Sequence, residues 1–306
     1  MNSLTKLKKI NDYVGYTHCS LYKLVVHVWF TAVLVALLCP PQVAIAQASN
    51  LEQDSVDLYQ ALIDSCFRYG NLGKYSEAEQ TLKRAIKLKP KHPLNTLLLN
   101  NLGGLQELQQ KPREALLSYS AALELAPTET TTRANRARLF VSLGNLKAAL
   151  TDYSLLVSME PTNEVHRYQR AMTYMLTKEY DLAEADLNTI IDSNPESLKP
   201  RIGLALLKTQ QAKYDEAERL YDYLLIRLPK STEVYEGRAR LYLAKGMRGY
   251  AVRDINKAFE LAGASASAPL YRLRAQIALA MGDNQAASQD LKTANKLDPT
   301  GKQGTP

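Results

Sequence analysis

The sequence predicts an all-α fold of stacked helix pairs, and three observations support it. A small residue recurs at near-constant spacing: four successive intervals are 34 residues each, and the outer two are 37 and 36. A unit of about 34 residues is the length of two helices joined by a turn. Prolines recur near the ends of most units, where they would stop a helix. The recurring residues are Ala78, Ala115, Ala149, Ala183, Ala217, Ala251 and Ala287.

Each unit is expected to contain a first helix, a tight turn, and a second helix that begins near the recurring alanine. A small residue in the first helix lets the two helices approach closely; these are Gly103, Ala137, Ala171, Ala205, Ala239 and Ala275. Gly73, Gly144, Gly246 and Gly282 stand where first helices should end, a position that favours positive φ. We therefore expect about fourteen helices in seven units: 59–92, 96–129, 130–163, 164–197, 198–231, 232–265 and 268–301.

The units also carry a family pattern. In the second unit it consists of Leu99, Leu102, Gly103, Ala115, Tyr119, Ala122 and Pro127, and the other units repeat most of these positions. In this respect the chain resembles the tetratricopeptide repeat family. The resemblance implies a right-handed α–α superhelix, or solenoid, that binds a protein or peptide and performs no reaction.

Four units share a pair of opposite charges separated by 16 residues: Arg136 with Asp152, Arg170 with Asp186, Arg238 with Asp254, and Arg274 with Asp290. Where the arginine is absent, as at Ser65, Leu102 and Leu204, the matching position is also uncharged. Charges that occur only together are expected to touch. We predict partly buried ion pairs within each repeat. The alternative is a row of arginines that waits for an anionic ligand.

The first 46 residues differ in composition from the rest. Lysines precede an apolar run over 24–38, and Ala44-Ile45-Ala46 has the small residues that a signal peptidase reads. We expect a secretory signal over 1–46 with cleavage near Ala46-Gln47, a linker over 47–58, and a disordered tail over 302–306. A retained signal anchor in the inner membrane is the alternative. In both cases the repeats would lie outside the cytoplasm.

The sequence offers no chemistry for an enzyme. After removal of the leader only Cys66, His92 and His166 remain of the cysteines and histidines, and no motif for a metal, a phosphate or another cofactor is present. The leader takes four lysines and Asp12 with it, which leaves 34 basic and 30 acidic residues. This mild positive charge does not indicate a nucleic-acid partner. We expect no enzyme, no metal and no cofactor.

In the family the first helices line the binding groove. Carried over, these positions combine apolar side chains with arginines, which suits an extended or helical peptide with some acidic character. The apolar members could instead pack against the next unit. The expected groove residues are Phe67, Asn100, Arg138, Tyr168, Met172, Met175, Leu206, Arg240, Arg272 and Gln276.

The function expected from these observations is a scaffold that binds a protein partner in the cell envelope of a Gram-negative bacterium, in assembly or secretion. The same scaffold held by an inner-membrane anchor is the second hypothesis, and a hidden enzyme is a distant third. Membrane contact is expected only through an uncleaved leader, and no obligate oligomer is expected.

Overall fold

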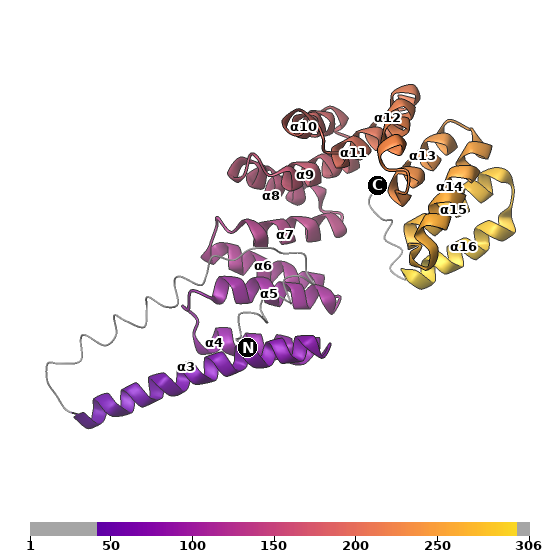
Figure 1. The fold of residues 1–306 in the computed structure, drawn as a ribbon. Coiled ribbons are helices and arrows are strands. Elements are labelled where there is room, and N and C mark those ends of the chain that lie inside the picture. The colour runs from indigo at the N-terminus through magenta and orange to yellow at the C-terminus, as the bar shows by residue number, and fades with distance from the viewer. Residues whose placement is uncertain (1–41, 299–306) are drawn as a thin grey trace. The chain divides into compact units, whose positions relative to one another are not determined.

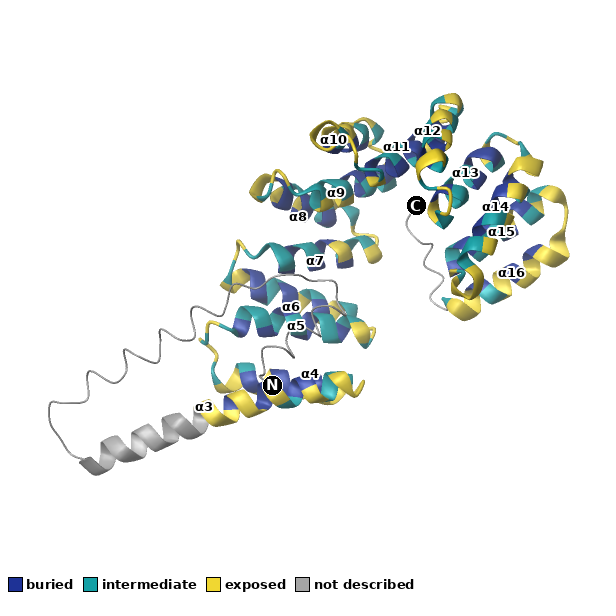
Figure 2. Cartoon of the chain, in the orientation of Figure 1, coloured by how far each residue is buried: buried dark blue, intermediate teal, exposed yellow. Residues whose placement is uncertain are grey.

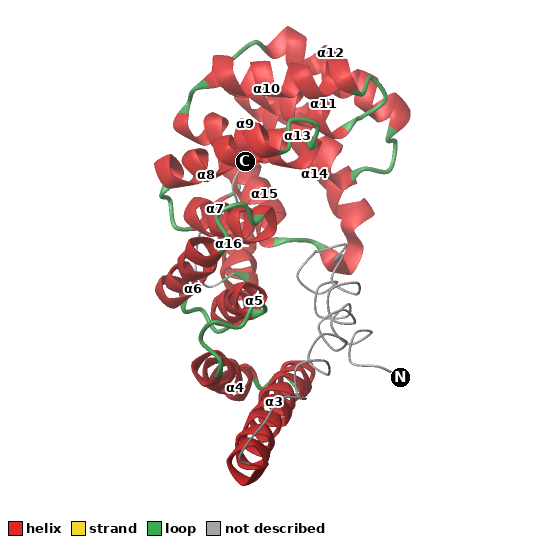
Figure 3. Ribbon diagram, turned by 90° about the vertical axis from the view of Figure 1, so that its left-hand side faces the viewer, coloured by secondary structure: helices red, strands yellow, loops and turns green. Residues whose placement is uncertain are grey.

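The computed structural model describes residues 42–298, with side chains from residue 56 onward. This part of the chain consists of helices joined by short turns, without strands (Figures 1 and 3). The predicted all-α class and the fourteen helices are confirmed. The α-helices are α3 (Gln42–Asn71), α4 (Tyr75–Leu88), α5 (Asn95–Leu108), α6 (Pro112–Leu125), α7 (Thr130–Ser142), α8 (Leu146–Met159), α9 (Glu164–Thr177), α10 (Tyr180–Ser193), α11 (Lys199–Gln210), α12 (Tyr214–Arg227), α13 (Thr232–Ala244), α14 (Arg248–Ala262), α15 (Ala268–Met281) and α16 (Asn284–Leu297).

The chain divides into two compact units, Met1–Leu139 and Phe140–Pro306, and the division falls within α7. In unit 1, α3 packs on α4 and α5 packs on α6. In unit 2, α9 packs on α10, α11 on α12, α13 on α14, and α15 on α16. Each of these is a first and second helix of one predicted repeat.

The recurring alanines form the centre of the helix pairs. All seven are 0 or 1% exposed, because a methyl group is the largest side chain that the close helix approach allows. Figure 2 shows buried residues on the faces where helices meet and exposed residues on the outer faces. The predicted close approach is tightest at Gly103, where a Cβ atom would lie 2.5 Å from the ring of Tyr119.

The turn between the two helices of a repeat always contains one residue with left-handed backbone geometry. The four predicted glycines have φ between 69° and 86°, as expected. In the other three repeats the same place is taken by Gln110, Lys178 and Ala212, with φ of 58°, 63° and 58°. The backbone of this turn is therefore constant, whether or not the sequence supplies a glycine.

The N-terminal expectations fall largely outside the described residues. The signal segment up to residue 41 and the tail over 302–306 are not described. Helix α3 already runs through residues 42–58, so the segment expected as a linker is helical. Within residues 42–298, no helix combines the length and the apolar character that a bilayer crossing requires.

One joint, between the sixth and seventh units, is irregular. After α14 the backbone turns at Gly263, with φ of 52°, into a short 3₁₀ helix, η1 (Gly263–Ser265). Pro269 then occupies the first turn of α15, where a missing N–H group costs no hydrogen bond.

Candidate partner-binding surface

The first helices of unit 2 form one continuous row. Helix α9 contacts α11, α11 contacts α13, and α13 contacts α15. Residues on the side of these helices that faces away from their second helices therefore share one surface. This surface carries most of the groove residues predicted from the sequence.

Three of the predicted groove residues are buried. Phe67 is 7% exposed and Met175 is 2% exposed, and each belongs to a hydrophobic core cluster. Asn100 is 8% exposed and accepts a hydrogen bond of 2.9 Å from the side chain of Asn135. In this arrangement these three side chains hold neighbouring helices together and are not open to a partner.

The apolar groove residues that remain accessible lie on α9 and α11. Tyr168, Met172 and Leu206 are half-buried at the edge of a core cluster. The ammonium group of Lys199 lies 4.9 Å from the centre of the Tyr168 ring. A Cβ atom on residue 203 would lie 3.1 Å from the Tyr168 ring, so the absence of a side chain at Gly203 leaves room for this ring. These residues make an aromatic and apolar patch with one cation beside it.

The hydroxyl of Tyr168 is a neutral group at any physiological pH. Burial, together with the nearby carboxylate of Glu233, raises the pKa of Tyr168 to about 12. The hydroxyl can therefore act as both donor and acceptor toward a bound segment. Farther along the row, Gln276 on α15 is exposed.

Each arginine predicted for the groove is neutralised by a carboxylate of the chain. The guanidinium of Arg138 lies 2.9 Å from Glu107, that of Arg240 lies 2.7 Å from Glu236, and that of Arg272 lies 3.0 Å from Asp298. The argument for a partner with acidic character rested on these arginines. Because their charge is matched locally, that argument loses its basis.

Three of the four predicted arginine–aspartate pairs are present as two-pronged contacts. Arg170 reaches the two oxygens of Asp186 at 2.8 and 2.7 Å, Arg238 reaches Asp254 at 2.6 and 3.1 Å, and Arg274 reaches Asp290 at 2.7 and 2.7 Å. The aspartate side chains are only 1 to 8% exposed. These arginines are occupied, which favours the structural interpretation over a row of free cations.

The fourth pair spans the two units. Arg136 lies in unit 1 and Asp152 in unit 2. Both residues take part in interactions, and their mutual contact stays a prediction.

Three of the four arginines also reach backward along the chain, which sequence reasoning missed. A guanidinium nitrogen of each contacts a side chain 16 residues earlier, in the second helix of the preceding repeat. Arg136 donates to Ser120 at 3.1 Å, Arg170 to Ser154 at 3.5 Å, and Arg238 to Asp222 at 2.9 Å. The symmetric spacing of 16 residues on either side was the available signal. Each of these arginines therefore connects two successive repeats.

A second polar link was also missed. Glu79, next to Ala78, is 5% exposed and accepts hydrogen bonds from Gln106, Gln109 and Lys111 of the next repeat and from Lys83. Burial alone would raise the pKa of Glu79, but these four donors outweigh it and lower the pKa to about 2. The corresponding Glu184 and Glu218 bind Lys208 and Lys245 at 2.6 and 2.7 Å. A glutamate directly after the recurring alanine was the signal.

The described residues contain no cluster of histidine, cysteine and carboxylate side chains that could hold a metal ion. Cys66 is buried, and burial raises the pKa of its thiol to about 12, so it is not a reactive thiolate. His166 lies 3.1 Å from Glu160, and His92 lies 3.2 Å from the hydroxyl of Tyr59. Both histidines are half-buried.

Comparisons with known proteins agree with this architecture. Family profiles described as tetratricopeptide repeat match residues 68–130, 167–197 and 268–300. The crystal structure of a tetratricopeptide repeat protein from Parabacteroides merdae is 36% identical, with a TM-score of 0.74, over 79% of this chain and 94% of that one. No curated protein matches the sequence significantly.

Two more distant structures share the fold. Yeast Tom70 is 20% identical with a TM-score of 0.59, over 75% of this chain and 49% of that one. PilW, described as a widely conserved type IV pilus biogenesis factor, is 17% identical with a TM-score of 0.53, over 68% of this chain and 96% of that one. At these identities the likeness concerns the fold alone.

Proposed function

The chain belongs to the tetratricopeptide repeat proteins, and on that premise we propose that it is a non-enzymatic scaffold that binds a segment of a partner protein. The observation that carries the proposal is the patch of Tyr168, Met172 and Leu206 on the first helices of unit 2, half-exposed beside Lys199. We name these four residues the α9–α11 patch.

The chemistry of the α9–α11 patch favours an apolar or aromatic segment over an acidic one. A methionine and a leucine adapt to side chains of different shape, and the ring of Tyr168 adds area at low entropic cost. The arginines farther along the row, Arg240 and Arg272, are matched by carboxylates, so an acidic partner would have to displace existing ion pairs there. Lys199 supplies one cation for a single carboxylate or backbone carbonyl.

The proposal is tested by photo-cross-linking from position 172 or 206 of the full chain in its native host, followed by mass spectrometry. We expect one dominant partner, and Met172→Glu should abolish its capture. Ile226→Glu is the matched control, because Ile226 is 79% exposed on α12 and outside the patch. Capture that survives Met172→Glu and Leu206→Glu together would refute the proposed surface.

We further propose that the scaffold works outside the cytoplasm, in an assembly or secretion process of a bacterial envelope. The lysines and the apolar run at the start of the sequence support this. N-terminal sequencing of the protein from its host should find Gln47 as the first residue. An intact Met1 in a membrane fraction would instead favour the anchored form of the same scaffold.

A further inference from the structure

The first repeat has a strongly basic surface that the proposed function does not use. Residues 59–92 contain seven lysines and arginines against three acidic residues. Four of the basic residues stand close together at the end of α4 and in the loop that follows. We name them the α4 basic patch: Arg84, Lys87, Lys89 and Lys91.

The patch is solvent-accessible and is not neutralised by the chain. Arg84, Lys87 and Lys91 are exposed, and within the described residues no carboxylate pairs with them. Lys83, by contrast, is held by Glu79 at 2.7 Å. Leu88 is 37% exposed and lies between the cations. In α6 and α10, which are second helices of their repeats as α4 is, acidic residues outnumber basic ones.

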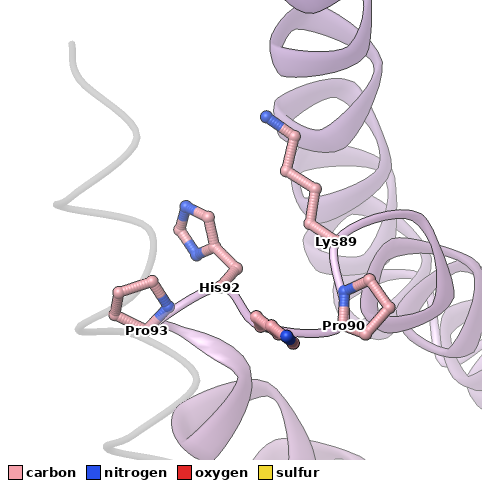
Figure 4. Close-up of a pocket in the computed structure, with 5 residues that line it drawn as sticks. Lys89, Pro90, His92 and Pro93 are labelled. Atoms are coloured by element: carbon pink, nitrogen blue, oxygen red, sulfur yellow. The ribbon is translucent and has the colours of Figure 1, made fainter.

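The loop after α4 adds a hollow beside the patch. Residues 89–93 line a hollow of about 460 Å³, and Figure 4 shows Lys89 and His92 extending to the same side of this loop. The ammonium group of Lys89 lies 5.7 Å from the centre of the Tyr59 ring, and the rings of Tyr59 and His92 are 4.6 Å apart. These contacts hold the loop against α3.

We propose that the α4 basic patch docks the first repeat on a membrane surface that contains anionic phospholipids. Three of the four cations are lysines on long side chains, which suit many phosphate positions better than one defined carboxylate. Leu88 can enter the boundary between headgroups and acyl chains. The proposal rests on the proposed envelope location.

The test uses the full chain and vesicles of phosphatidylglycerol with phosphatidylcholine, or of phosphatidylcholine alone. Each lysine or arginine near an anionic surface strengthens binding about 5-fold. Replacing three of them, in the variant Arg84→Gln/Lys87→Gln/Lys91→Gln, should therefore reduce the preference for phosphatidylglycerol vesicles by about 100-fold. The preference of the wild-type protein should also fall steeply with added salt.

The matched control is Arg248→Gln/Lys292→Gln/Lys296→Gln, which removes the same charge from three exposed positions in unit 2. All variants keep the leader, so its own contribution to vesicle binding is common to them, and circular dichroism verifies that each is folded. An equal loss in both variants, or no loss in the first, overturns the proposal.

A polyglutamate peptide separates lipid from acidic protein as the occupant. If the α4 basic patch binds polyglutamate and the triple variant binds vesicles as the wild-type protein does, the patch serves an acidic protein and the proposal is wrong. None of these outcomes bears on cross-linking at position 172, so the scaffold function is judged separately.

Discussion

The repeats 232–265 and 59–92 hold their helices in the same geometry by different polar devices. In repeat 232–265, the buried Asp254 accepts hydrogen bonds from Arg238, which also contacts Asp222 of the preceding repeat. In repeat 59–92, the equivalent places are Ser65 and Thr81, and the Thr81 hydroxyl donates to the backbone carbonyl of Glu77 at 2.8 Å.

In repeat 59–92, the link to the next repeat is made by Glu79, which lies two residues before Thr81. This carboxylate gathers three donors from the next repeat. Repeat 232–265 is joined to its predecessor by a glutamate as well, through Lys245 and Glu218, and adds the contact of Arg238 with Asp222. The comparison teaches that the fold requires a polar connection between successive repeats but does not fix the residue that makes it. Five experiments test how the polar contacts, the close helix approach and the turns stabilise these repeats, from the largest expected effect to the smallest.

Replacing Arg238 by alanine should cause the largest loss of stability. Asp254 is 1% exposed and would keep only the 3.3 Å contact with Arg253. Leaving a buried charge with a poor partner costs about 3 kcal/mol. Urea unfolding followed by circular dichroism measures the loss. The double variant Arg238→Ala/Asp254→Ala should lose less than the single one, and an equal or larger loss would show that the charge is not the cause.

Introducing the ion pair into the neutral repeat is the converse experiment. Thr81→Asp alone places a carboxylate at a position that is 9% exposed and should cost about 2 to 3 kcal/mol. Adding Ser65→Arg, 16 residues earlier, should recover most of that loss. A double variant that is no more stable than Thr81→Asp would show that the pair depends on features beyond its spacing.

Gly103→Ala tests the steric side of the neutral repeats. The new methyl group would lie 2.5 to 2.8 Å from the fully buried ring of Tyr119, so the helices must separate. We expect a loss of about 2 kcal/mol. Gly249→Ala is the control, because no atom lies within 4 Å of the added group. Equal melting temperatures of the two variants would contradict the close-approach argument.

The stability of unit 1 should depend on pH through Glu79. Because the folded pKa of Glu79 is about 2, against 4.5 for the free side chain, its contribution is complete above about pH 4.5 and is lost as the pH falls toward 2. Glu79→Gln should cost about 1 to 2 kcal/mol at neutral pH and flatten this dependence. Hydrogen exchange over α3 to α5 between pH 5 and 3 measures it. A dependence that persists in the variant would assign it to another carboxylate.

The smallest effect concerns the turn. Ala212 adopts a φ of 58°, which costs an alanine about 1 kcal/mol relative to glycine. Ala212→Gly should therefore raise the stability by about that amount, and Gly246→Ala, at the same place in the next repeat, should lower it similarly. Differential scanning calorimetry resolves both shifts. Changes of the same sign would mean that the turn geometry is not the controlling factor.

The helix pairs could be predicted from the sequence because every repeat requires a small residue where its two helices approach closely. Ala149, Ala183 and Ala217 occupy equivalent buried places, and spacing alone located them. The arginine–aspartate pairs were predictable for the same reason. The arginine and the aspartate are present together in four units and absent together in others, so comparing units of the same sequence revealed the pair.

The candidate site was less predictable because a first helix packs on more than one side. Met172 and Met175 are both apolar on α9, yet Met175 is 2% exposed while Met172 is half-buried. Helical periodicity cannot distinguish a neighbour in the same repeat from one in the next. The pairing of Arg272 with Asp298, 26 residues away, likewise depends on where α16 ends.

The position of Arg170 and Arg238 between two repeats has an evolutionary consequence. For both, the partner 16 residues ahead is an aspartate in the same repeat, whereas the contact 16 residues behind is Ser154 in one case and Asp222 in the other. Duplication or deletion of a whole repeat would carry the arginine and its aspartate together and would only exchange the rearward contact for another polar group. The array can thus lengthen or shorten by recombination without stranding a charge in the interior.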